Sequence, residues 1–257
     1  MRTRTRITRF NVVLIVVGIL VTVAAINRVE AQETVLEPLP TNGVIGKLTR
    51  YAVKPDQQEN FRNALSNYVS QALTEEGNVQ AEAYFERDNQ SALWLIERWK
   101  NRNELDRFGD SLQSKAIDSL KREALSTNPE IYHLTDLEPI SKQQWRRPAR
   151  AEDHPFTLML FVDLKEGTQD EFKATYHVAM PKVRSQAGVV TYQLSQVLGD
   201  DTKFVTYEKF RSDEAFQRHL NFPPVKSVID YLQTSIKKPP FQSGLHTLIE
   251  FAPLKRD

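Results

Sequence analysis

The stretch FTLMLFVDL, residues 156–164, decides how this chain folds. Alternate residues of a β-strand point to opposite faces of the sheet. In this stretch one face is apolar at every second position from Phe156 to Leu164, and the other face carries Met159 and Phe161. A strand that is apolar on both faces is buried on both faces. The sheet that contains it must therefore be covered on both sides.

The chain contains two diverged copies of one unit. Without a gap, an offset of 111 residues aligns Phe61 with Phe172, Gly77 with Gly188, Val79 with Val190, Glu97 with Glu208, Trp99 with Phe210, Leu105 with Phe216 and Arg107 with Arg218. A unit of this length is too long for a solenoid repeat and has the size of a small domain. We therefore predict one domain over residues 43–139, a linker over residues 140–154 and a second domain over residues 155–254.

Hydrophobic periodicity and turn residues predict the same order of elements in both copies. In the first copy we expect strands 43–53, 79–86, 92–99 and 130–137, with helices 57–73 and 101–125. In the second copy we expect strands 156–164, 189–198, 203–210 and 245–251, with helices 169–186 and 213–236. Proline is expected to kink or split the first of these last two helices at Pro181, and Pro223 with Pro224 to interrupt the second.

Each copy is thus predicted to be β-α-β-β-α-β, the ferredoxin-like plan, which belongs to the α+β class. Two helices cover one face of a four-stranded sheet in that plan, and the other face needs a partner. With two copies in one chain, we expect the two sheets to pack against each other around a shared, barrel-like core. The linker is rich in charge, and we expect it to lie on the surface, with Trp145 next to Arg146 and Arg147.

The first 31 residues have the three parts of a secretory signal. An apolar run occupies residues 12–26, and Ala31 precedes a suitable cleavage point. Before the run lie the basic residues Arg2, Arg4, Arg6 and Arg9. An uncleaved membrane anchor is the alternative, although a span normally takes about 20 apolar residues. Either way, we expect the folded part outside the cytoplasmic membrane, in the periplasm or secreted.

Composition excludes several classes of function. With residues 1–31 removed, 29 basic and 32 acidic residues remain, a net charge of about −3, and the signs are interspersed. We therefore expect no nucleic-acid partner. The chain has no cysteine, which excludes disulfides and thiolate metal sites. Its five histidines do not pair at helical spacing, and neither a phosphate loop nor a Gly-x-Ser-x-Gly motif occurs, so we expect no metal site.

The second copy carries an ordered set of marks. Residues 185–194 read SQAGVVTYQL and residues 204–220 read FVTYEKFRSDEAFQRHL. They resemble the antibiotic biosynthesis monooxygenase family, which is similar to quinol monooxygenases and belongs to the dimeric α+β barrel group. The marks are a glycine turn, a tyrosine shortly after it, a strand ending in Glu-x-Trp or Glu-x-Phe, and a helix with a histidine. They fall on Gly188, Tyr192, Glu208 with Phe210, and His219.

The first copy keeps only some of these marks. Gly77, Glu97 and Trp99 are present, but Ala81 and Phe108 stand where the second copy has its tyrosine and histidine. The resemblance therefore implies an intramolecular version of the dimeric barrel, in which the first copy is a degenerate partner. We expect a surviving active site in the second copy.

The resemblance implies oxidation of a phenolic or quinol substrate by dioxygen without metal, flavin or haem. We expect His219 to act as the base, because imidazole exchanges protons near neutral pH. Tyr192 or Tyr207 is expected to donate to the substrate oxygen. Tyr207 and Glu208 are neighbours on one strand, so they cannot face one cavity without a bulge. The expected substrate-binding residues are Phe210, Glu208, Phe161 and His177.

Several alternatives stay open on the sequence alone. Glu208 is also explained as a structural carboxylate, Tyr192 and Phe210 as packed aromatics, and His219 or His177 as ordinary helix residues. A non-catalytic binding protein that holds an apolar molecule in the barrel cavity is the alternative function. That ligand could be haem, held by His219 or His177. We expect a small aromatic substrate and dioxygen as partners, and no membrane contact beyond the N-terminal segment. An intramolecular pseudo-dimer leaves further oligomerisation open.

Overall fold

A computed structural model of the chain describes residues 43–234, 236–237 and 244–253. These residues all belong to one compact unit. The predicted signal segment, residues 1–31, lies outside the described residues. Among the helices of the described part, none is both long and apolar enough for a membrane span.

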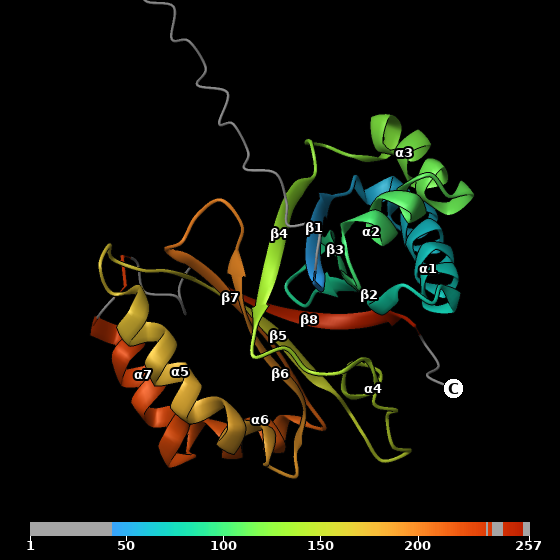
Figure 1. The fold of residues 1–257 in the computed structure, drawn as a ribbon. Coiled ribbons are helices and arrows are strands. Elements are labelled where there is room, and N and C mark those ends of the chain that lie inside the picture. Colours follow the sequence, from blue (N-terminus) through green and yellow to red (C-terminus); the bar gives the residue numbers. More distant parts are fainter. Residues whose placement is uncertain (1–42, 235, 238–243, 254–257) are drawn as a thin grey trace, which may run out of the picture. The chain divides into compact units, whose positions relative to one another are not determined.

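Both copies have the predicted order of strands and helices (Figure 1). The first repeat consists of β1 (Ile45–Ala52), a 3₁₀ turn (Pro55–Gln57), α1 (Gln58–Thr74), β2 (Asn78–Glu86), β3 (Asn89–Trp99), α2 (Arg102–Gly109), α3 (Leu112–Ala124) and β4 (Glu130–Leu137). After the short helix α4 (Lys142–Trp145), the second repeat consists of β5 (Phe156–Asp163), α5 (Gln169–Arg184), β6 (Val189–Val197), β7 (Lys203–Phe210), α6 (Asp213–Leu220), α7 (Pro223–Thr234) and β8 (Leu245–Ala252).

The two sheets join into a single closed barrel with the strand order β1-β3-β2-β8-β5-β7-β6-β4. Two seams connect the repeats: β2 pairs with β8, and β4 pairs with β6. The last strand of each repeat therefore pairs with the first strand of its own repeat and with the second strand of the other. This confirms the predicted intramolecular α+β barrel. Closure removes the exposed edges that two separate sheets would have.

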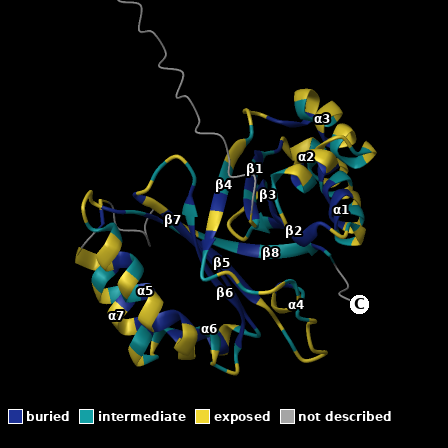
Figure 2. Cartoon of the chain, in the orientation of Figure 1, coloured by how far each residue is buried: buried dark blue, intermediate teal, exposed yellow. Residues whose placement is uncertain are grey.

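Strand β5 is buried on both faces, as its sequence predicts. Phe156, Leu158 and the other residues of their parity pack into the apolar core beneath the helices of the second repeat. Met159 and Phe161 instead join the cluster that fills the barrel interior. The first repeat has its own apolar core under α1 and α3. Figure 2 shows buried strands in the centre and exposed residues on the outer helix faces. The barrel thus separates an interior from two helix-covered outer layers.

Two of the predicted helices differ from expectation. The helix expected over residues 101–125 is broken into α2 and α3, because Ser111 caps a new helix by accepting from the Ser114 amide at 3.1 Å. By contrast, α5 runs through Pro181 without splitting, since the proline stands in its last turn. The predicted interruption before Pro223 is confirmed by the break between α6 and α7.

The prediction that the linker only lies on the surface is wrong for its single tryptophan. Ser141 and Gln144 form a capping box that begins α4 and turns Trp145 inward. Trp145 is only 2% exposed. The Arg98 guanidinium lies 3.9 Å from the centre of its ring, and the Tyr207 ring lies 5.8 Å away. Burial of the indole against a guanidinium and an aromatic ring outweighs the polar surroundings of the linker.

Candidate active site

Alternation along β7 divides the predicted site residues between two environments. Phe210 packs into the core beneath the helices, and Glu208 on the same face approaches α6. Tyr207 belongs to the cluster inside the barrel. This confirms that Tyr207 and Glu208 do not share one cavity.

A group of side chains, which we call the helix-side cluster, gathers between β6, β7 and the helices of the second repeat. His219 Nε2 lies 3.7 Å from Glu208 Oε2, and His219 Nδ1 lies 3.0 Å from Gln186 Oε1. The imidazole ring centre is 4.8 Å from the Phe210 ring and 5.7 Å from the Tyr192 ring. Four of the seven predicted site residues therefore meet in one place: His219, Tyr192, Glu208 and Phe210.

Local sequence explains how α6 brings the histidine to the sheet. Ser212 caps the helix by accepting from the Ala215 amide at 3.2 Å. Gly188 faces this first turn, and a Cβ on it would lie 2.5 Å from the Ala215 Cβ. The glycine therefore allows the helix to approach the strand closely. One turn further on, His219 is 3% exposed.

Burial dominates the electrostatics of the helix-side cluster. Desolvation raises the pKa of Glu208 to about 7, although the Thr206 hydroxyl donates to it at 2.9 Å and partly opposes the rise. Desolvation lowers the pKa of His219 to about 4. At neutral pH the imidazole is therefore uncharged, and the carboxyl group exchanges its proton. A carboxyl group poised in this way is a candidate for proton transfer.

Two tyrosines complete the cluster. Burial, reinforced by the negative charge of Glu208, raises the pKa of Tyr176, which hydrogen-bonds Tyr192. Burial also raises the pKa of Tyr192. Both phenols thus stay protonated and can serve as hydrogen-bond donors. Sequence reasoning did not single out Tyr176, Gln186 or Thr206; the apolar spacing of α5 makes Tyr176 look like a core residue only.

The other three predicted site residues lie elsewhere. Tyr207 and Phe161 face the barrel interior. His177 lies on the outer side of α5, where its side chain is 74% exposed and its Nδ1 contacts Glu138. The structure therefore does not bring these three side chains to His219, and for His177 this agrees with the alternative of an ordinary helix residue.

The haem alternative requires an imidazole nitrogen that faces open space. In His219, Nδ1 faces Gln186 and Nε2 faces Glu208. His177 lies on an exposed helix face, away from the barrel cavity in which the binding alternative places the ligand. Neither arrangement fits an axial ligand, so no step below involves haem. Across the residues that the structure describes, no group of three or more potential metal ligands is found.

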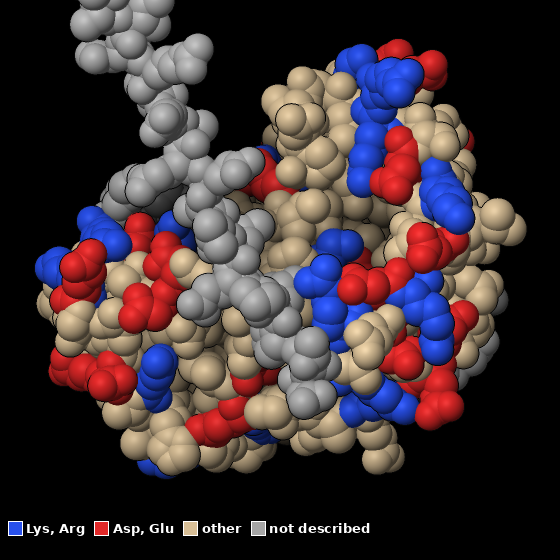
Figure 3. Space-filling model, turned by 45° about the horizontal axis from the view of Figure 1, so that its top comes forward, with Lys and Arg blue, Asp and Glu red and all other residues tan. Residues whose placement is uncertain are grey.

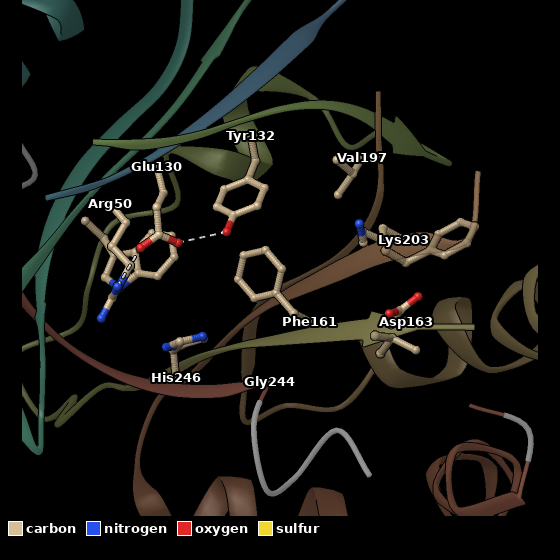
Figure 4. Close-up of a pocket in the computed structure, with 12 residues that line it drawn as sticks. Arg50, Glu130, Tyr132, Phe161, Asp163, Val197, Lys203, Gly244 and His246 are labelled. Carbon is tan, nitrogen blue, oxygen red and sulfur yellow. Dashed lines mark hydrogen bonds and ion pairs between the residues drawn. The ribbon is translucent and has the colours of Figure 1, made fainter. Parts of the chain in front are cut away.

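A second feature lies at one mouth of the barrel. There a pocket of about 400 Å³ is lined by aromatic side chains and by ion pairs (Figure 4). Its residues come from several strands of both repeats, so only folding brings them together. Sequence reasoning identified one of them, Phe161. Acidic and basic side chains are interspersed over the face drawn in Figure 3, as the sequence composition predicts.

The model of the antibiotic biosynthesis monooxygenase family matches the chain twice, over residues 45–118 and 155–231. The chain belongs to this family. The two matches lie inside the two predicted domains and confirm the resemblance that the second copy carries. As a member of the family with two repeats in one chain, the protein has a pseudo-dimer where single-repeat chains would need a partner.

Solved structures share the fold of this family member. A proposed monooxygenase from Lactobacillus acidophilus NCFM is 14% identical, with a TM-score of 0.67 over 81% of this chain and 94% of that one. A proposed monooxygenase from Fusobacterium nucleatum is also 14% identical, with a TM-score of 0.68 over 82% and 94%. An anthrone oxidase-like protein is 11% identical, with a TM-score of 0.55 over 82% and 94%. At these identities the similarity establishes the fold only. No curated protein sequence matches the chain.

Proposed function

We propose that the protein is an exported, cofactor-independent monooxygenase that oxidises an aromatic quinol or polyketide-like phenol with dioxygen. The observation that carries the proposal is the Glu208–His219 pair, which is buried in the repeat that keeps the family marks. Membership of the family and the anthrone oxidase-like structure support an aromatic substrate. The basic and apolar residues before Gln32 support export.

The reaction needs a proton acceptor before it needs an oxidant. A phenol becomes a strong electron donor only as its phenolate. If the phenol is conjugated to a CH₂ group, the change from CH₂ and O₂ to C=O and H₂O balances without another reductant. For a quinol, one oxygen atom converts a ring C–H to C–OH, and the other is reduced to H₂O by the two electrons and two protons released when the quinol becomes the quinone. The protein then has to bind the ring, remove a proton and hold the developing oxyanion.

The roles follow from the protonation states of the cluster. Glu208, with its pKa raised by burial to about 7, is better matched to a base at neutral pH than His219, whose pKa burial lowers to about 4. We therefore assign proton removal to Glu208. Neutral His219 donates to Gln186 Oε1 through Nδ1, so its Nε2 is an acceptor that faces the carboxyl group once Glu208 holds the proton. Tyr192 donates to the substrate oxygen. This revises the expectation that the histidine itself is the base.

Dioxygen uptake tests the proposal. The purified protein is mixed with naphthalene-1,4-diol or an anthrone, and uptake is compared with the autoxidation of the same compound alone. We expect uptake above that background, lost in His219→Ala and kept in His154→Ala, a matched substitution of an exposed histidine in the linker.

Uptake that is equal in the His219→Ala variant and the unmodified protein would contradict the assignment of the site. No uptake at all, with 2-naphthol still raising the melting temperature, would instead favour the non-catalytic binding function.

A further inference from the structure

The pocket at the barrel mouth, which we call the barrel-mouth pocket, has the size of a small-molecule site. Its volume of about 400 Å³ falls in the range of ligand pockets, about 300–1,000 Å³. The residues that matter to the argument are Arg50, Trp94, Tyr132, Phe161, Val197 and His246. They come from β1, β3, β4, β5, β6 and β8, so both repeats contribute.

Aromatic rings dominate one side of this pocket. Phe161 is the centre of the group: its ring centre is 5.1 Å from Tyr132, 5.9 Å from Trp94 and 5.5 Å from His246. In Figure 4 Tyr132 and Phe161 lie one above the other between a charged end at Arg50 and another at Lys203. Aromatic faces and edges at such distances favour a flat aromatic guest over an aliphatic one.

A carboxylate–imidazole pair gives the pocket its polar specificity. Glu86 Oε1 accepts from Arg50 Nε at 3.1 Å and from Trp94 Nε1 at 2.9 Å. His246 Nδ1 lies 3.1 Å from the same oxygen. Burial would raise the pKa of Glu86, but the hydrogen bonds from His246 and Trp94 and the positive charge of Arg50 act against burial and lower it, also when the imidazole is uncharged. Glu86 is therefore an acceptor, and His246 donates to it through Nδ1.

The hydrogen bond to Glu86 fixes the role of the other imidazole nitrogen. A neutral imidazole that donates through Nδ1 is an acceptor at Nε2. His246 lines the pocket, so this acceptor is available to a guest beside the Phe161 ring. A group that donates one hydrogen bond from the edge of an aromatic ring matches this arrangement, and a phenolic hydroxyl is such a group.

We propose that the barrel-mouth pocket binds a planar aromatic alcohol of about two fused rings, stacked against Phe161 and Tyr132, with its hydroxyl donating to His246 Nε2. This site is distinct from the helix-side cluster: Phe161 faces the barrel interior, while Glu208 faces the helices on the other side of the sheet. The proposal does not rest on the oxygenase activity and holds equally for a protein that only binds its ligand.

Calorimetric titration of the purified protein tests the hydroxyl and the ring separately. The probes are 2-naphthol and 2-methoxynaphthalene, in which a methyl group replaces the hydrogen that the hydroxyl donates; His246→Phe shows how much of the difference is due to the size of the methyl group. Oxygen is excluded, so no turnover interferes. We expect the unmodified protein to bind 2-naphthol about tenfold more tightly, and His246→Phe, which keeps a ring but has no acceptor, to bind both probes with similar affinity.

A second variant tests whether the probes bind in the barrel-mouth pocket, and it does so by filling the pocket rather than by removing the hydrogen-bond acceptor. Val197→Trp places an indole in the pocket and is expected to abolish binding of both probes, or to remove one binding site if the helix-side cluster takes another. Val178→Trp is the matched control, because Val178 on α5 is 60% exposed. Thermal unfolding of each variant verifies that it is folded.

Three results would overturn the proposal. They are no binding of 2-naphthol by the unmodified protein, unchanged binding in Val197→Trp, and a preference for 2-naphthol that persists in His246→Phe at the site that Val197→Trp removes. Dioxygen uptake is measured separately with naphthalene-1,4-diol or an anthrone, so the last two results leave the oxygenase proposal unchanged. If 2-naphthol does not bind but uptake is observed, only the barrel-mouth proposal fails.

Discussion

Glu97 and Glu208 occupy the same position of the two repeats and have opposite surroundings. Glu97 accepts from the Tyr68 hydroxyl at 3.0 Å and from Trp99 Nε1 at 2.7 Å, and Lys47 Nζ lies 3.6 Å away. At the offset of 111 residues, the three donors become Ala179, Phe210 and Leu158. The second repeat has thus lost each of the groups that hold Glu97.

At two other positions the second repeat has gained polar groups that the first repeat lacks. Ala81 and Phe108 of the first repeat become Tyr192 and His219 in the second. A carboxylate surrounded by donors is structural, whereas a buried carboxyl beside a neutral imidazole can exchange a proton. The comparison teaches that five substitutions around one retained glutamate are enough to separate a scaffold from a candidate active site.

The largest effect is expected from removing the carboxyl group of the second repeat. Glu208→Gln keeps the size of the side chain but cannot accept a proton, so kcat/KM for dioxygen-dependent oxidation should fall about 10³-fold. Glu97→Gln is the same substitution in the first repeat and should leave the value for folded protein within about twofold. Equal losses in both variants, measured by oxygen uptake, would break the comparison.

The pH dependence of stability should report the raised pKa of Glu208 directly. Burial raises the pKa of Glu208 from 4.5 to about 7 on folding, so its ionisation lowers the free energy of unfolding as pH rises through this range. His219 acts oppositely, because burial lowers its pKa from 6.5 to about 4 and its contribution is lost as pH falls. Glu208→Gln removes only the Glu208 contribution. The free energy of unfolding of this variant, relative to that of the unmodified protein, should therefore be about 3 kcal/mol higher at pH 8 than at pH 4.

Urea unfolding at several pH values measures this gain. The control is Tyr207→Phe, which lies on the same strand but faces the barrel interior. A stability difference between Glu208→Gln and the unmodified protein that does not change with pH would show that burial has not raised the pKa of Glu208.

In the first repeat the effect should fall on stability instead. Trp99→Phe installs the residue that the second repeat has at the equivalent position and removes the 2.7 Å hydrogen bond to Glu97. Because the carboxylate is buried, we expect a loss of about 1–3 kcal/mol in the free energy of unfolding, with unchanged oxygen uptake per folded molecule. Thermal or urea unfolding measures the loss, and a neutral substitution would mean that Tyr68 and Lys47 alone hold the carboxylate.

The smallest effect should come from Lys47→Leu, which copies Leu158 of the second repeat. The ion pair is 3.6 Å long and Lys47 is partly exposed, so solvent screens it. We expect a loss of no more than about 1 kcal/mol that shrinks in high salt. A larger loss, or one independent of salt, would mean that Lys47 is as important to Glu97 as Trp99.

Much of the fold was predictable because its signals are local or repeated. The two apolar faces of residues 156–164 require cover on both sides, and the 111-residue offset supplies the second sheet. The break at Ser111 and the burial of Trp145 were not predicted, since the first depends on a cap stronger than the helical pattern and the second on a guanidinium from another strand. The seams between β2 and β8 and between β4 and β6 likewise depend on closure of the whole barrel.

The candidate site was predictable only where the sequence of a single strand or helix determines which way a side chain points. Alternation along β7 places Glu208 and Phe210 on one face, and the family marks bring Tyr192 and His219 to it. The barrel-mouth pocket could not be predicted, because Glu86 and His246 are 160 residues apart and meet only through the seam between the repeats. The pKa of Glu208 is raised because apolar residues stand where the first repeat has hydrogen-bond donors around Glu97. This difference is visible only when the two repeats are aligned with each other.

The last strand of each repeat pairs with both repeats, so neither half of the chain can close the barrel alone. A gene fragment encoding one repeat would leave the edges of β2 and β4, or of β6 and β8, without partners and open to aggregation. The first repeat therefore cannot be deleted without exposing strand edges of the second. Whatever side chains it carries, the first repeat supplies β2 and β4, the strands with which β8 and β6 of the second repeat pair.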